Sequence, residues 1–399
     1  MIEPFLSAVP VLMKLEEAGY EAYFVGGSVR DFLLNKQISD VDIATSATPE
    51  EVKRVFSRTV DVGIEHGTVL VIYNNESYEI TTFRTEAEYL DFRRPKEVAF
   101  IRSLKEDLQR RDFTMNAIAM DRQGNLIDPF NGRLAIDEKV IQTVGSAMER
   151  FQEDALRMMR AVRFVSQLSF AMESQTITAL TKLIPLLDNI AVERKRTEFE
   201  KLLAGQNRKK AISILIDTDL YSYLPGLKNQ KKFLELLLAY HCEKLNIKEM
   251  WSLLLFCLEL KNNDADSFLR GWRLPVKAVR DIQITLTYLA KRLEQEWTVY
   301  DLYTAGLDTI QSVEKLYLVL KGIEEKKSIY SWKKVYQELP IKERSEMNVT
   351  GNDLMQWFNK SGGPWLKETL FEIEHAILIG KVANNYQDIK EWLVECSRN

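Results

Sequence analysis

Gly26-Gly27-Ser28-Val29-Arg30-Asp31, followed by Asp40-Val41-Asp42, is the most informative stretch of this 399-residue chain. The apolar residues 22–25 before it predict a short strand that leads into a glycine turn. Adjacent glycines let backbone N–H groups approach a phosphate closely, and Arg30 adds a charged fork beside them. The turn is therefore a candidate phosphate site, although a Gly-Gly pair alone is more often a plain turn.

Asp40 and Asp42 have the spacing of two carboxylates that share a metal site. We expect residues 40–43 to form a strand, on which side chains at i and i+2 project from one face about 6–7 Å apart. That separation suits a pair of Mg²⁺ ions, which lie about 3.5–4 Å apart in two-metal sites. An isolated Asp-x-Asp pair is more often a solvated strand edge. A phosphate-binding turn beside a metal site predicts nucleotidyl transfer.

Composition and charge are those of an ordinary globular protein. Hydrophobic residues make up 46% and charged residues 28%, and 54 basic against 58 acidic residues give a net charge of −4. A nucleic-acid binder with this balance must gather its positive charge locally. No apolar run reaches the roughly 18 residues of a membrane span, and we expect no membrane partner. Three isolated cysteines favour a reducing cytoplasm, and three histidines leave catalysis to carboxylates and arginines.

The periodicity of apolar residues changes near residue 145. Residues 1–145 alternate predicted helices (5–18 and from Thr48 onward) with predicted hairpins (69–83 and 117–127), whereas later residues show helical i, i+3, i+4 spacing almost throughout. We therefore predict an α+β chain with a small mixed-sheet head followed by an elongated all-helical part. The predicted divisions are a head at 1–145, a neck at 146–205, a body at 206–310 and a tail at 311–399.

Three further motifs carry candidate site residues. Glu79 lies within the predicted strand 78–83, where it is either a third carboxylate or an outward-facing residue of a half-exposed strand. Arg110 and Arg111 precede an Asx- and Thr-rich turn, and they can hold triphosphate oxygens or belong to a solvated basic turn. Residues 153–164 predict an amphipathic helix.

On that predicted helix Asp154, Arg157 and Arg160 follow at i+3 intervals, with Arg163 a turn further along. An ordinary Asp–Arg helix pair is one reading. The other is a face that attracts an anion, because no acid follows Asp154 on the stripe. An Asp–Arg pair can also select a base: the amino groups of cytosine and adenine suit a carboxylate acceptor, whereas guanine and uracil present a carbonyl there. Amino acids would then select CTP and ATP.

Together, Gly26–Asp42, R-R-D-F-T-M-N-A at 110–117 and E-D-A-L-R at 153–157 resemble the polymerase-β-like nucleotidyltransferases. Within them the chain resembles the class II tRNA nucleotidyltransferases, which include bacterial CCA-adding enzymes and poly(A) polymerases. The resemblance implies the following roles: Mg²⁺ binding by Asp40 and Asp42; activation of the attacking 3′-hydroxyl by Glu79; phosphate contacts by Gly27, Arg30 and Arg111; base reading by Asp154 and Arg157; phosphate or ribose contacts by Arg160 and Arg163; and support by Gly26, Asp112, Asn116, Arg194 and Glu198.

The resemblance also implies a substrate. We expect addition of C, C and A to the 3′ end of tRNA from CTP and ATP, with the body and tail binding RNA and the acceptor arm. Residues 63–68 and the expected flexible loop at 84–95 favour a CCA-adding enzyme over a CC-adding enzyme or a poly(A) polymerase. Residues 326–334, which interleave lysines with aromatics, are either an RNA-contacting surface or the wet face of a helix. An A-adding or CC-adding relative, a poly(A) polymerase and a catalytically silent RNA-binding scaffold remain alternatives, and a homodimer is left open.

Overall fold

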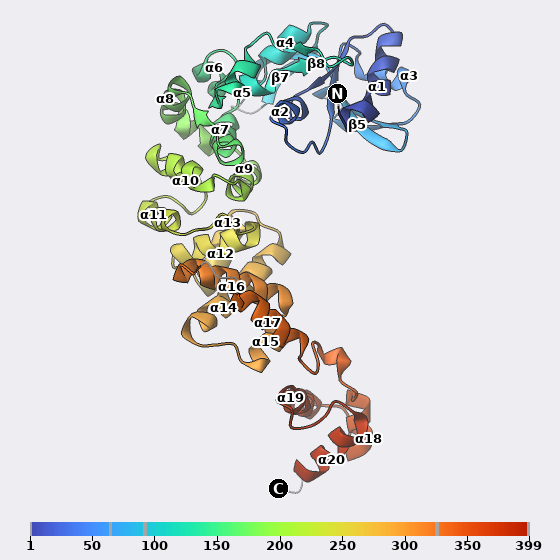
Figure 1. The fold of residues 1–399 in the computed structure, drawn as a ribbon, viewed down its shortest axis with the longest axis vertical. Coiled ribbons are helices and arrows are strands. Elements are labelled where there is room, and N and C mark those ends of the chain that lie inside the picture. The colour runs from blue at the N-terminus through green and yellow to red at the C-terminus, as the bar shows by residue number, and fades with distance from the viewer. Residues whose placement is uncertain (1, 64–65, 91–93, 324–326, 397–399) are drawn as a thin grey trace. The chain divides into compact units, whose positions relative to one another are not determined.

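The computed structural model describes residues 2–63, 66–90, 94–323 and 327–396. The chain divides into two compact units, Met1–Glu235 and Leu236–Asn399. Strands are concentrated in the N-terminal part of the first unit, and the described residues from α6 onward are largely helical (Figure 1). The predicted α+β class is thereby confirmed. The borders predicted at residues 145, 205 and 310 remain predictions.

A mixed sheet forms the centre of the N-terminal part. Within the described residues it has seven strands in the order β3-β4-β5-β2-β1-β8-β9. β2 runs parallel to β5, and the other neighbours are antiparallel. The strands are Ala22–Val25 (β1), Asp42–Thr45 (β2), Thr59–Gly63 (β3), Thr68–Tyr73 (β4), Glu76–Thr82 (β5), Ala119–Met120 (β8) and Leu126–Ile127 (β9).

Local sequence explains the two hairpins and a helix start that were predicted. β4 and β5 join through Asn74 and Asn75, whose φ values of 51° and 64° suit the left-handed conformation that asparagine tolerates in tight hairpin turns. β8 and β9 form the second hairpin. Helix α3 (Pro49–Val55) begins with a capping box, in which Thr48 and Glu51 satisfy each other's backbone N–H groups.

Strand β1 separates two packing layers. Phe24 contacts Phe5 of helix α1, with ring centroids 4.8 Å apart. Val25 joins a buried cluster with Phe83 and Leu108 on the other side. This alternation follows from the two-residue period of a strand. The helices of this part are α1 (Phe5–Glu17), α2 (Gly27–Leu33), α3, α4 (Leu104–Gln109) and α5 (Gly132–Asp137).

One connecting segment differs from its prediction. Residues 84–95 were expected to form a loop without regular structure, but the backbone of Arg84–Leu90 (β6) pairs antiparallel with Arg94–Phe100 (β7). Residues 91–93 lie outside the described part. Backbone hydrogen bonds between two strands do not depend on the side-chain periodicity from which the loop was inferred.

The helices that follow complete the first unit. They are α6 (Ala147–Glu153), α7 (Leu156–Leu168), α8 (Ser174–Leu183), α9 (Val192–Ala204) and α10 (Arg208–Asp217), with a short parallel pair of strands at Val140–Ile141 (β10) and Ala171–Met172 (β11). The C-terminal ends of α7 and α9 lie close together. A Cβ at Gly205, the residue that follows α9, would lie only 2.1 Å from the hydroxyl oxygen of Ser166 on α7. Glycine is therefore required at that position.

The second unit is helical in its described residues. Helix α11 (Lys231–Ala239) crosses the boundary between the units. It is followed by α12 (Ile247–Cys257), α13 (Asn262–Gly271), α14 (Val276–Glu294), α15 (Val299–Ala305), α16 (Leu307–Lys321), α17 (Lys327–Gln337), α18 (Gly351–Phe358), α19 (Pro364–Leu378) and α20 (Tyr386–Cys396). Among the residues that the structure describes, no helix has the length and apolar character needed to cross a membrane.

Candidate active site

A cavity of about 1010 Å³ in the first unit collects most of the predicted site residues. Its walls come from the β1–α2 turn, the start of β2, the segment after α4, and helices α7 and α9. The predicted residues that line it are Gly26, Gly27, Arg30, Asp42, Arg111, Asp112, Asn116, Asp154, Arg157, Arg160, Arg163 and Arg194. Asp40, Glu79 and Glu198 do not line it. The carboxylates of Asp40 and Glu79 raise the pKa of the lining residue Asp42, and Glu198 forms an ion pair with the lining residue Arg163.

The glycine turn brings three predicted residues together. Gly26 follows the end of β1 with φ 75° and ψ −136°, a conformation that favours glycine. A Cβ on Gly26 would lie 3.2 Å from Arg111 Nη1 and 3.4 Å from Asp42 Oδ2. The backbone conformation therefore favours glycine here, and a Cβ would displace the Arg111 guanidinium by a few tenths of an ångström. The turn, Arg111 and Asp42 consequently share one corner of the cavity.

The acidic residues have a different arrangement from the predicted one. Asp42 is the first residue of β2, and Asp40 precedes the strand, so the prediction that one strand holds both is wrong. In the parallel pairing of β2 with β5, Asp42 lies directly opposite Glu79. Burial, the Glu79 carboxylate and the Asp40 carboxylate raise the pKa of Asp42, and Arg111 opposes them. Like charges therefore gather around Asp42.

This donor set fits a divalent cation that is bound mainly through the substrate. In the described part of the chain, no group of three or more His, Cys, Asp or Glu side chains could hold a metal ion by itself. Mg²⁺ is usually held by one or two carboxylates together with water and substrate phosphates. A cation beside Asp42 would also offset the repulsion that raises the pKa of this carboxyl. Asp40 and Asp42 as metal ligands stay a prediction.

The two arginines of the 110–117 motif are anchored by an aspartate that the sequence reasoning missed. Asp107 Oδ1 lies 2.8 Å from Arg110 Nη2, and Asp107 Oδ2 lies 3.2 Å from Arg111 Nη2. The Asp107 side chain is only 1% exposed. Burial by itself raises the pKa of Asp107, but the two guanidinium groups lower it overall. Asp107 precedes Arg110 and Arg111 by three and four residues, and this spacing of ion pairs on a helical turn is the sequence signal that could have identified it.

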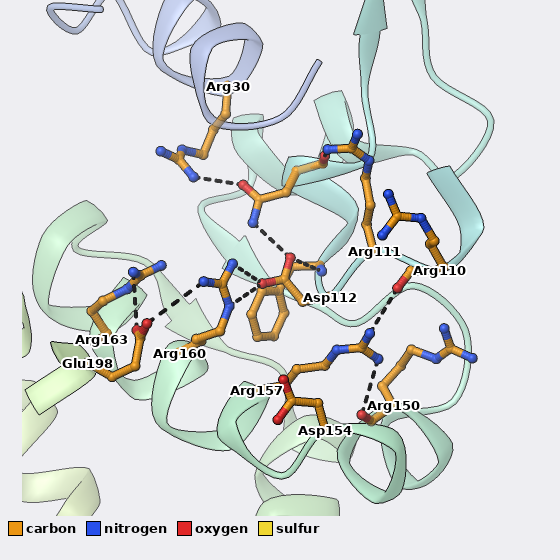
Figure 2. A network of polar contacts seen from close by, with 12 residues as sticks. Arg30, Arg110, Arg111, Asp112, Arg150, Asp154, Arg157, Arg160, Arg163 and Glu198 are labelled. Atoms are coloured by element: carbon orange, nitrogen blue, oxygen red, sulfur yellow. Dashed lines mark hydrogen bonds and ion pairs between the residues drawn. The ribbon is translucent and has the colours of Figure 1, made fainter. Parts of the chain in front are cut away.

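Asp112 is the centre of a polar network (Figure 2). Its carboxylate accepts hydrogen bonds from the Phe113 backbone N–H at 2.8 Å, from Asn116 Nδ2 at 3.0 Å and from Arg160 Nε at 2.7 Å. Burial opposes ionisation, but Arg160 and Asn116 outweigh it and lower the pKa of Asp112 to about 2. Asn116 Oδ1 in turn accepts from Arg30 Nη1 at 2.7 Å. The network thus connects the glycine turn to helix α7.

The alternative reading of Asp154 and Arg157 as an ordinary helical ion pair is wrong, and the helix predicted over residues 153–164 begins only at Leu156. Asp154 is an extended residue between α6 and α7, where its carboxylate accepts from the Leu156 backbone N–H at 3.1 Å. Its ionic partner is Arg194 of α9, at 2.7 Å. Arg157 instead lies 2.6 Å from the carboxylate of Glu153. Both side chains line the cavity, each held by a different partner.

The predicted arginine stripe on α7 is compensated by acids from other elements. Arg160 pairs with Asp112, and Arg163 Nη1 lies 3.1 Å from the Glu198 carboxylate of α9. The expectation of a stripe without compensating acids is therefore wrong, because the partners come from outside the helix. The Arg163 guanidinium also lies 4.2 Å from the centroid of the Phe164 ring. Burial and the nearby Arg160 lower the pKa of Arg163 to about 10.

The cavity thus combines two chemical environments. One corner has a glycine turn, Arg111 and a carboxylate that gains from a cation, which suits phosphate groups. The wall made by α7 and α9 offers a carboxylate and a guanidinium, Asp154 and Arg157, held apart from each other by separate partners. These groups can accept from an amino group and donate to a ring nitrogen or carbonyl.

Family comparisons cover most of the chain. The Poly A polymerase head domain matches residues 22–142, an RNA and SrmB-binding site of polymerase A matches residues 169–231, and tRNA nucleotidyltransferase domain 2 matches residues 244–393. A CCA-adding enzyme of Geobacillus sp. (strain WCH70) is 47% identical over 99% of this chain and 98% of its own length. A CCA-adding enzyme of Listeria monocytogenes serotype 4b (strain CLIP80459) is 49% identical over 98% of this chain and 99% of its own.

Solved structures show the same relationship. The crystal structure of the Bacillus stearothermophilus CCA-adding enzyme in complex with CTP matches with a TM-score of 0.91 and 46% identity, over 100% of this chain and 98% of that chain. The Thermotoga maritima CCA-adding enzyme complexed with tRNA matches with a TM-score of 0.64 and 21% identity, over 99% and 96%, and supports the fold alone. By sequence and by structure, this chain belongs to the family of CCA-adding enzymes, the nucleotidyltransferases that its motifs predicted.

Proposed function

We propose that this protein adds C, C and A to the 3′ end of tRNA, using CTP and ATP and releasing pyrophosphate at each addition. The observation that carries the proposal is that one cavity holds both the phosphate-binding corner at Gly26, Asp42 and Arg111 and the base-selecting pair Asp154 and Arg157. A nucleoside triphosphate that spans this cavity has its base at one wall and its phosphates at the other. The protein side chains then select the incoming nucleotide, and no nucleic-acid template is needed.

The phosphate corner binds the triphosphate and favours its cleavage. Gly27 lets the triphosphate approach the backbone, while Arg30 and Arg111 neutralise its charge. Asp40 and Asp42 would hold Mg²⁺, which would supply Lewis-acid stabilisation of the charge that develops on the phosphate oxygens. Glu79, opposite Asp42 in the sheet, orients or deprotonates the attacking 3′-hydroxyl. Catalysis comes mainly from positioning and electrostatic stabilisation.

The base-selecting wall distinguishes CTP and ATP from UTP and GTP. The Asp154 carboxylate accepts a hydrogen bond from the amino group of cytosine or adenine, and Arg157 donates to a neighbouring acceptor of the base. Uracil and guanine place a carbonyl oxygen opposite the carboxylate and are rejected. Arg194 holds Asp154 at 2.7 Å, so the carboxylate keeps its direction. Arg160 and Arg163, supported by Glu198, contact the ribose or phosphate.

The charge cluster around Asp42 argues against a silent scaffold. Burial and the neighbouring Glu79 and Asp40 carboxylates raise the pKa of Asp42, so its ionised form is less favourable in the folded protein than in an unfolded chain. A protein that only binds RNA gains nothing from this repulsion, whereas a metal-assisted transferase does. Partners follow from the activity: the 3′ end and acceptor arm of tRNA, with the body and tail binding RNA. We place the protein in the cytoplasm, and light scattering with and without tRNA tests the homodimer.

One assay tests the activity. The protein is incubated with Mg²⁺ and tRNA that lacks its terminal CCA, together with CTP, ATP or both nucleotides. We expect two added nucleotides with CTP alone and three with both. A stop at two nucleotides with both present identifies a CC-adding relative, a single A an A-adding relative, and a long A tract a poly(A) polymerase. No incorporation under any condition identifies the scaffold.

A further inference from the structure

The corner between α6 and α7 directs Arg157 back onto the last turn of α6. Arg157 Nη1 donates to the main-chain carbonyl of Arg150 at 3.2 Å and to the Glu153 carboxylate at 2.6 Å. Arg157 Nη2 donates to the main-chain carbonyl of Arg110 at 3.0 Å. A cation suits the carbonyl end of a helix, where the last C=O groups lack partners within the helix. Helix α6 therefore fixes one side of the Arg157 guanidinium.

The side chain of Arg150 contacts the same carboxylate as Arg157. Its Nη2 pairs with Oε1 of Glu153, while Oε2 of that carboxylate pairs with Arg157. Arg150 Nη1 also donates to the main-chain carbonyl of Gln109 at 3.3 Å. Two successive carbonyls, those of Gln109 and Arg110, thus accept from Arg150 and Arg157 respectively. Arg150 is absent from the residues that line the cavity, and its side chain is only 17% exposed.

We propose that Arg150 is a positioning residue for base selection, which acts through Glu153 and the 109–110 backbone to orient the Arg157 guanidinium. The inference rests on the proposed function of Arg157. Without the Arg150 guanidinium, the Oε1 atom of Glu153 loses its partner and the carboxylate turns both oxygens toward Arg157. The Arg157 guanidinium then rotates with the carboxylate. Because hydrogen bonds weaken steeply with misalignment, a rotated guanidinium reads the base poorly.

Position 150 favours arginine because its guanidinium contacts the Glu153 carboxylate and the Gln109 carbonyl at the same time. A planar guanidinium can bridge a carboxylate and a carbonyl that lie in different directions. A lysine keeps the charge beside Glu153 but presents a single ammonium group, so it retains the ion pair more easily than the bridge. Glutamine removes the charge, so that Glu153 keeps only its ion pair with Arg157. The three side chains therefore form a graded series at residue 150.

The test compares Arg150→Gln and Arg150→Lys with the wild-type protein. Arg133→Gln is the matched control, because Arg133 is an exposed arginine of the same unit that does not line the cavity. The readout is kcat/KM for CTP divided by kcat/KM for UTP, measured on tRNA that lacks CCA. We expect this ratio to fall about 10-fold in Arg150→Gln and less in Arg150→Lys, and to stay unchanged in Arg133→Gln.

A double-mutant cycle tests the route through Glu153. If Arg150 acts through this carboxylate, Arg150→Gln adds little to the loss of discrimination already caused by Glu153→Gln. Full additivity of the two losses would overturn the route and with it the proposal. An unchanged CTP/UTP ratio in an active Arg150→Gln protein, or an equal loss for both nucleotides, would also overturn the proposal while leaving the proposed function intact. A wild-type protein that adds no nucleotide would overturn both. Should Arg150→Gln not fold, the Arg150→Lys ratio decides.

Discussion

Asp112 and Arg160 are 48 residues apart in the chain, yet Arg160 Nε lies 2.7 Å from the Asp112 carboxylate. The Asp112 residue is 8% exposed and carries its charge because three donors surround it. Asp112 follows the arginine pair that we propose binds the phosphates, and Arg160 belongs to the helix that carries part of the proposed base-selecting wall. This contact therefore fixes the distance between the two halves of the proposed active site.

Replacement of Asp112 by asparagine is expected to destabilise the protein in a pH-dependent way. Because the folded-state pKa is about 2, against about 4 in an unfolded chain, the ionised carboxylate stabilises the fold fully above pH 4. That contribution is lost as the pH falls through about 2. We expect Asp112→Asn to lower the free energy of unfolding by about 2 kcal/mol at pH 7. Urea unfolding at pH 7, 4 and 2 measures it.

The difference between Asp112→Asn and wild type should shrink steadily between pH 4 and pH 2. A difference at pH 2 as large as that at pH 7 would show that the carboxylate charge is not the cause.

Asp42→Asn is expected to abolish nucleotide addition while leaving the protein at least as thermally stable as the wild type. Burial and the neighbouring Glu79 and Asp40 carboxylates disfavour the ionised form of Asp42, and asparagine removes this charge. Melting temperature without divalent cation, and incorporation of labelled CTP with Mg²⁺, are the two measurements. Chelation of divalent cations should stop addition by the wild-type protein, and added Mg²⁺ should restore it. Full turnover by Asp42→Asn would exclude this carboxylate from the chemistry.

Asp154→Asn is expected to relax the rejection of UTP. An asparagine amide can donate to the carbonyl of uracil, which the carboxylate cannot do, so we expect the preference for CTP to fall by about 10-fold or more. Single-turnover incorporation of each nucleotide on tRNA that lacks CCA measures the preference. Glu149→Gln, an exposed acid on α6, serves as the control and should leave selection unchanged. Unaltered selection by Asp154→Asn would refute base reading at this residue.

Gly26→Ala is expected to lose activity by more than its cost in stability explains. At φ 75° an alanine strains the backbone by about 1 kcal/mol, and its Cβ would lie 3.2 Å from Arg111 Nη1. Gly145 is a matched control, since its φ of 73° is similar and a Cβ there meets nothing within 4 Å. Both variants should unfold more easily in urea, but only Gly26→Ala should lose more than 10-fold in CTP incorporation. Equal activity of the two variants would remove the close approach as an explanation.

Local features of the fold were predictable from sequence, because their physical causes are local. The capping box at Thr48 and Glu51 and the turn at Asn74–Asn75 depend on neighbouring residues alone. The pairing of residues 84–90 with residues 94–100 was not predictable from the side-chain pattern, because it is made by backbone groups. Likewise β2 begins at Asp42, two residues later than predicted, so Asp40 lies outside the strand.

For the active site, the amino-acid sequence predicted which residues are candidates for the chemistry: the glycine turn, the acidic pair, the two arginines and the Asp154–Arg163 segment. The contacts that hold each of these residues depend on the tertiary structure. Asp154 pairs with Arg194 and not with Arg157, and Arg160 pairs with Asp112. A motif records residue types at short spacing, whereas a buried charge takes whichever opposite charge the packing of distant elements brings within reach. The partners of these charges are therefore a property of the fold.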